Sequence, residues 1–137
     1  MIKEEYVSFE TAKLLKEKGF DEPCDHFYRF DKPNTIYTGS TYRNSDIGDK
    51  QIKVYNTCTQ SLAMRWLREV HNLYISIDCR CDKCGIYFCF DIFRFIEKHS
   101  DFLYCSGPDE YDYDAPVDYT YEDACEVAIR YCLKNLI

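Results

Sequence analysis

The sequence predicts a single α+β domain over residues 1–137, built on an antiparallel sheet of about four to six short strands. Two observations lead to this fold class. Amphipathic segments with helical caps occur near 9–18, 59–70 and 121–136, and the segments between them have the composition and turn residues of strands. Because the order is helix, strands, helix, hairpin, loop and helix, the three helices are expected mainly on one face of the sheet.

The helices are predicted from their caps and their apolar faces. Ser8 can cap the first helix. Thr57 and Gln60 have the spacing of a capping box ahead of the second, which carries a continuous apolar stripe. Thr120 caps the third, with Asp123 at its third position. Acidic residues gather at the start of this last helix, as the helix dipole favours.

The strands are predicted from alternation and from β-branched and aromatic residues. Residues 73–79 alternate strictly, with Leu73, Ile75 and Ile77 on one side. The turn "DKCG" joins them to residues 85–96, so these two segments form a hairpin. The other strands are expected at 26–30, 35–39, 50–55 and, briefly, 102–105.

Composition and charge argue against several classes of function. No stretch of about 20 uncharged apolar residues occurs and the first residues lack a secretion signal, so a cytoplasmic protein without membrane contact is expected. The net charge is −7, and no Lys or Arg lies between Lys98 and Arg130, so direct binding to nucleic acid is not expected. No glycine-rich phosphate loop or catalytic motif is present, and no enzymatic activity is expected.

The segment "DCRCDKCGIYFC", residues 78–89, is the first candidate site, because it contains four cysteines. Cys81 and Cys84 match the turn of a zinc knuckle, in which two thiolates bind one ion. One interpretation is therefore a small zinc-binding module with Cys79, Cys81, Cys84 and Cys89 as ligands. The alternative is a sulfur-rich hairpin with structural cysteines, because a second ligand pair is lacking and Cys89 lies in an apolar run.

Two further thiol chemistries each lack a required group. A thioredoxin-like role would need Cys81 and Cys84 at the start of a helix, where the dipole lowers the thiol pKa, but a β-turn is expected there. Cys24 and His26 would share one face of a strand, yet no third group is expected to orient them for nucleophilic catalysis.

The stretch "DEYDYDAPVDYTYED", residues 109–123, contains the second candidate site, and most of it falls in a loop expected at about 106–119. Tyrosine supplies rigid contact area, and clustered carboxylates complement a basic partner surface. The expected partner-binding residues are Asp109, Glu110, Tyr111, Asp112, Tyr113 and Asp114. A merely solubilising acidic loop is the alternative. Calcium binding is not favoured, because the spacing departs from that of an EF-hand.

Three stretches cover the expected helices: "YVSFETAKLLKEKGFDEPC", "TCTQSLAMRWLREVHNLYISID" and "YEDACEVAIRYCLKNLI". Together they resemble small uncharacterised proteins of bacteriophages and of mobile elements of gut bacteria. Such proteins have no established activity or site, so the resemblance implies only a setting, that of an accessory protein in a bacterial cytosol. Neither candidate site lies within the matching stretches, apart from their edges.

The sequence thus predicts a non-enzymatic accessory protein that binds a protein partner through its acidic, tyrosine-rich surface. No cofactor is expected in that case. The alternative is the zinc-binding module on the Cys79–Cys89 hairpin. The oligomeric state is not predicted.

Overall fold

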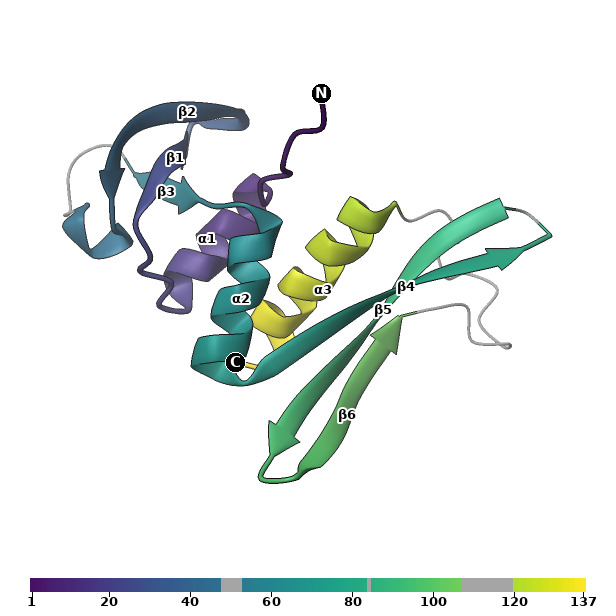
Figure 1. Ribbon diagram of the computed structural model, residues 1–137. Coiled ribbons are helices and arrows are strands. Elements are labelled where there is room, and N and C mark those ends of the chain that lie inside the picture. The colour runs from purple at the N-terminus through teal and green to yellow at the C-terminus, as the bar shows by residue number, and fades with distance from the viewer. Residues whose placement is uncertain (48–52, 84, 107–119) are drawn as a thin grey trace.

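The computed structural model (Figure 1) describes residues 1–47, 53–83, 85–106 and 120–137. These residues form three α-helices, one short 3₁₀ helix and six strands. The helices are α1 (Phe9–Glu17), α2 (Gln60–His71) and α3 (Tyr121–Asn135), and the 3₁₀ helix is η1 (Asn44–Asp46). The strands are β1 (Cys24–Arg29), β2 (Lys32–Tyr42), β3 (Val54–Thr57), β4 (Leu73–Asp82), β5 (Gly85–Ile96) and β6 (His99–Ser106).

The fold is α+β, as predicted, and its strands are divided between two antiparallel sheets. The first sheet has the order β2-β1-β3 and the second the order β4-β5-β6. Figure 1 shows the helices between these sheets. Helix α1 contacts β3, α3 contacts β4 and β5, and α3 also contacts both other helices. The apolar faces of both sheets therefore close on one core, in which side chains from all three helices are buried.

The helix ends follow the expected chemistry, with one correction. The Ser8 hydroxyl accepts a hydrogen bond from the Thr11 amide at 3.3 Å, and Thr120 and Asp123 form the predicted capping box. The cap of α2 is Thr59 and not Thr57, because the Thr59 hydroxyl accepts from the Leu62 amide. The Thr57 side chain is used elsewhere, since its hydroxyl donates to the Val7 carbonyl at 3.1 Å.

The β4-β5 hairpin agrees with the predicted alternation. Leu73 is fully buried, and Ile75 and Ile77 pack against the core from the same face of β4. Strand β6 is longer than the brief strand expected at 102–105, because it pairs with β5 as far as His99. Residues 107–119, most of the expected acidic loop, lie outside the described residues.

Candidate functional site

The register of the β4-β5 hairpin separates the cysteines that were expected to bind zinc. Cys79 pairs with Phe88 and Cys81 with Ile86, whereas Cys89 pairs with Asp78. Directly opposed residues share a face of the sheet, so Cys89 lies on the face opposite to Cys79 and Cys81. Cys89 is buried, and the other two thiols are exposed.

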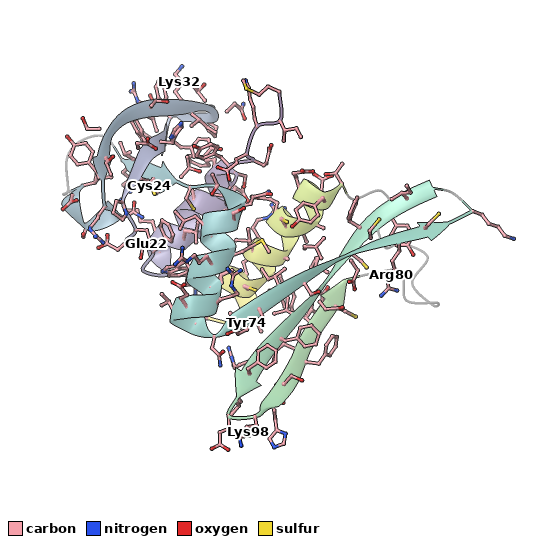
Figure 2. All side chains as sticks on the ribbon, in the orientation of Figure 1. Glu22, Cys24, Lys32, Tyr74, Arg80 and Lys98 are labelled. Carbon is pink, nitrogen blue, oxygen red and sulfur yellow. The ribbon has the colours of Figure 1, made fainter. Side chains whose placement is uncertain are left out.

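The three predicted zinc ligands that the structure describes therefore do not converge on one point. Within the described residues, no group of three or more His, Cys, Asp or Glu side chains is arranged to hold a metal ion. Cys84, the fourth expected ligand, is outside the described part of the chain. Figure 2 shows Arg80, between Cys79 and Cys81, on the part of the hairpin that extends past the helices.

Burial makes most of the described thiols poor nucleophiles. It raises the pKa of Cys24 and of Cys125 to about 11 and that of Cys132 to about 12. Burial is also the main cause of the raised pKa values of Cys58 and Cys89. The thiolate is the reactive form of cysteine, so these five side chains are mostly in the unreactive thiol form near neutral pH.

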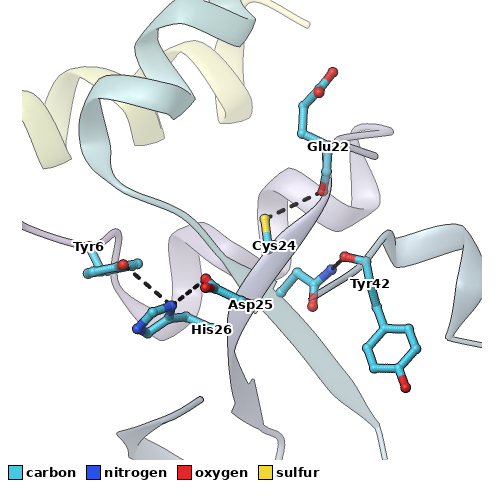
Figure 3. Close-up of polar contacts among 7 residues, drawn as sticks. Tyr6, Glu22, Cys24, Asp25, His26 and Tyr42 are labelled. Atoms are coloured by element: carbon cyan, nitrogen blue, oxygen red, sulfur yellow. Dashed lines mark hydrogen bonds and ion pairs between the residues drawn. The ribbon is translucent and has the colours of Figure 1, made fainter. Parts of the chain in front are cut away.

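Cys24 and His26 lie on the same strand but have separate partners (Figure 3). The Cys24 thiol donates to the Glu22 carbonyl at 3.4 Å. The His26 Nδ1 atom lies 2.6 Å from an oxygen of Asp25 and 3.4 Å from the Tyr6 hydroxyl. The expectation that no third group orients His26 was wrong, because Asp25 does so. The hydrogen bond from His26 lowers the pKa of Asp25. No reactive thiol accompanies this pair, since the Cys24 thiol stays protonated.

A cleft of about 560 Å³ opens between the N-terminal segment, the β1-β2 hairpin and the first turns of α3. Its charged lining consists of five carboxylate side chains and one lysine: Glu4, Glu5, Glu122, Asp123, Glu126 and Lys3. Its apolar and aromatic lining consists of Tyr6, Phe9, Tyr28, Pro33 and Ile36. We refer to this feature as the acidic cleft. The combination of surplus negative charge and aromatic surface suits a cationic ligand.

The acidic wall of the cleft is positioned by the start of α3. Asp123 accepts a hydrogen bond from the Thr120 amide at 3.2 Å and so completes the capping box. Glu122 and Asp123 both lie in the first turn, where the positive end of the helix dipole stabilises negative charge. One turn later, Glu126 faces the start of α1 and accepts from the Ser8 amide at 3.0 Å.

The aromatic floor of the cleft is held in place by contacts of Tyr28 with neighbouring strands and with the N-terminal segment. Tyr28 and Ile36 pair across β1 and β2 and therefore share that face. The Tyr28 ring packs edge-on against Phe9 at 5.7 Å between centroids, and its hydroxyl donates to the Val7 carbonyl at 2.9 Å. Tyr28 is 6% exposed, whereas Ile36 is 41% exposed. Tyr28 is thus packed into the protein, whereas Ile36, at the rim formed by β2, is accessible to solvent.

Carboxylates contribute to raised pKa values of two tyrosines that line the cleft. The pKa of Tyr28 is raised by burial and, to a smaller extent, by Glu126 and Glu5. The pKa of Tyr6 is raised by burial, then by Asp25 and Glu4. Negative charge opposes ionisation of a phenol, so these directions agree with an excess of carboxylates around the cleft.

Sequence reasoning did not find the acidic cleft. Its lining comes from separate parts of the chain, residues 3–6, 8–9, 28, 33–34, 36, 60, 122–123 and 126, which only the tertiary fold brings together. The one available signal was the acidic start of α3, which the helix dipole alone explains. The expected partner-binding residues, Asp109 to Asp114, lie outside the described residues.

Comparison with known proteins identifies no relative of this chain. No protein-family model, curated protein or solved structure matches the chain. None of the helices within the described residues has the length and apolar character needed to cross a membrane.

Proposed function

We propose that this chain is a non-enzymatic accessory protein that binds a positively charged protein partner through the acidic cleft and the acidic segment preceding α3. The observation that carries the proposal is the lining of the cleft, where five carboxylates and one lysine surround an aromatic floor. Carboxylates that line a cleft increase the rate of encounter with a basic protein surface and disfavour binding of an acidic surface. The aromatic floor supplies contact area that is already ordered, so little entropy is lost on binding.

The other observations support a binding role more than a catalytic one. The described thiols with resolved pKa shifts are protonated near neutral pH, and the His26–Asp25 pair has no reactive thiol beside it. The resemblance of the helical stretches to small phage and mobile-element proteins supports an accessory role in a bacterial cytosol. The acidic loop precedes the acidic wall in the sequence, and the proposal includes both.

The proposal is tested with a lysine-rich peptide and two charge-matched variants. The probe is a fluorescent peptide of about nine residues, the length of an ordinary strand, in which lysine and threonine alternate. The cleft variant is Glu4→Lys with Glu122→Lys, both exposed and both in the lining. The control is Glu17→Lys with Glu22→Lys, both exposed and outside the lining. Each pair moves the net charge from −7 by +4 to −3.

Fluorescence anisotropy at physiological salt should show that the cleft variant binds the peptide at least about tenfold more weakly than the unmodified chain. The control should stay within about twofold, because its charges are separated from the cleft and are screened by salt. An equal loss in both variants would mean that the peptide responds to net charge alone, and the cleft would then have no special role.

A further inference from the structure

Strand β2 is an outer strand with one edge that pairs with no other strand among the residues the structure describes. It is the first strand in the order β2-β1-β3, it is eleven residues long, and every residue in it except Tyr37 is exposed. Figure 1 shows it curving along the outside of the molecule. The backbone amides and carbonyls along this edge are therefore available to a further strand.

The side chains of β2 do little to prevent such pairing. Natural edge strands are usually protected by charged residues, prolines, bulges or a covering element. In β2 the only charge and the only proline come at its start, at Lys32 and Pro33. The rest of the strand, "NTIYTGSTY", is uncharged and rich in threonine and tyrosine. The pairing with β1 is regular only from Ile36 to Thr38 and shifts register on both sides of this stretch, between Lys32 and Ile36 and beyond Thr38, so the regular edge is short.

The same part of β2 forms the rim of the acidic cleft. Asn34 and Ile36, two residues apart, both line the cleft, and Ile36 shares the inner face with Tyr28. A strand added beside β2 would place every second side chain on this inner face, at a spacing of about 7 Å. Those side chains would lie beside Asn34 and Ile36 at the rim, and the long side chains of lysine or arginine could extend from there toward the carboxylates that line the cleft.

We propose that β2 binds an extended segment of a partner protein as a fourth strand of its sheet, with lysine or arginine at alternate positions facing the acidic cleft. Main-chain hydrogen bonds to the open edge hold the segment, and the carboxylates select its charge. The choice of a basic segment depends on the proposed function, whereas the mode of binding depends on the open edge of β2.

Backbone N-methylation of the probe peptide tests the mode of binding. Successive amides of a strand point to opposite sides, so only one alternate set can donate to β2. One peptide is methylated at its lysine amides and a second at its threonine amides. We expect one of these two peptides to bind at least about tenfold more weakly than the unmethylated peptide and the other to stay within about threefold.

Amide hydrogen exchange on the protein locates the added strand. The peptide should slow exchange at alternate residues of β2, while β6, the outer strand of the second sheet, serves as the internal control and should not change. Equal binding of both methylated peptides, together with the expected loss in the cleft variant, would overturn strand addition and leave the proposed function standing.

Two other results would also overturn the inference. If no basic peptide binds at millimolar concentration, the proposed function fails and strand addition fails with it. If sedimentation shows that the chain self-associates, and β2 amides become protected with rising protein concentration but not with peptide, the strand is occupied by a second copy of this chain and not by a partner segment.

Discussion

Glu126 is the residue at which the three helices meet the N-terminal segment. Its carboxylate on α3 accepts hydrogen bonds from the Ser8 amide at 3.0 Å and the Thr11 hydroxyl at 2.5 Å. It also accepts from the Gln60 side chain of α2 at 3.4 Å. One wall of the acidic cleft is therefore built by a side chain that also binds the first residues of α1, so the cleft and the helix packing depend on the same contacts.

Removal of the Glu126 carboxylate should destabilise the fold. Glu126→Ala leaves partly buried donors without their acceptor, and we expect a loss of about 2–4 kcal/mol in the free energy of unfolding. Glu126→Gln keeps one acceptor oxygen and should lose about half as much. Urea denaturation measures both. Glu122→Ala, at an exposed position in the first turn, is the control and should change by less than about 0.5 kcal/mol. A Glu126→Ala protein as stable as this control would disprove the role of the carboxylate.

Asp91 on β5 gives a pH-dependent prediction. Its pKa is raised above 3.8, first by burial and then by the neighbouring Asp78. The folded state therefore binds this proton more tightly than the unfolded state, and the ionised carboxylate lowers stability at every pH above its folded pKa. Asp91→Asn removes that penalty and should raise the free energy of unfolding at neutral pH.

The gain from Asp91→Asn should vanish as the pH falls below about 4, where Asp91 is protonated in both states. Denaturation curves at a series of pH values provide the measurement. A gain that persists unchanged in acid would show that the effect does not come from the charge of Asp91.

Among the elements, local patterns predicted the helices and the β4-β5 hairpin, whereas long-range pairing decided the rest. The alternation of Leu73, Ile75 and Ile77 depends on neighbours in sequence, and it placed this face of β4 correctly. The division into two sheets depends on β1 pairing with β3 across about thirty residues, for which no local signal exists. The spacing of Cys79, Cys81 and Cys89 suggested proximity, but only the register with β5 shows which face each thiol occupies.

The acidic segment before α3 provides the prediction at this scale. Reversal of four of its five carboxylates, with Asp109, Glu110, Asp112 and Asp114 each changed to Lys, should weaken binding of the lysine peptide by about three- to tenfold. The acidic cleft remains intact in this variant, so binding should not be abolished. Stability should change little, since the substitutions precede the Thr120 cap. Unchanged affinity would limit the binding surface to the cleft.

At the scale of the whole molecule, a buried apolar core supports a surface with a large negative charge. Both sheets and all three helices contribute to one apolar core, so the acidic cleft is lined by elements that are held in place from behind. A net charge of −7 favours encounter with basic surfaces of any kind, whereas the binding that we propose at the cleft and at the edge of β2 depends also on shape. Charge and shape therefore make separate contributions, and each can be changed without the other.

The most direct test of the central claim is to locate the bound lysine peptide by backbone NMR on the 16.3 kDa chain. We predict chemical-shift changes centred on the acidic cleft, at Ser8, Ile36 and Glu122, with few changes on the outer face of the β4-β5-β6 sheet. Changes centred on the β4-β5 hairpin around Cys79 and Cys81, or spread evenly over the surface, would contradict the assignment of the acidic cleft as the binding site.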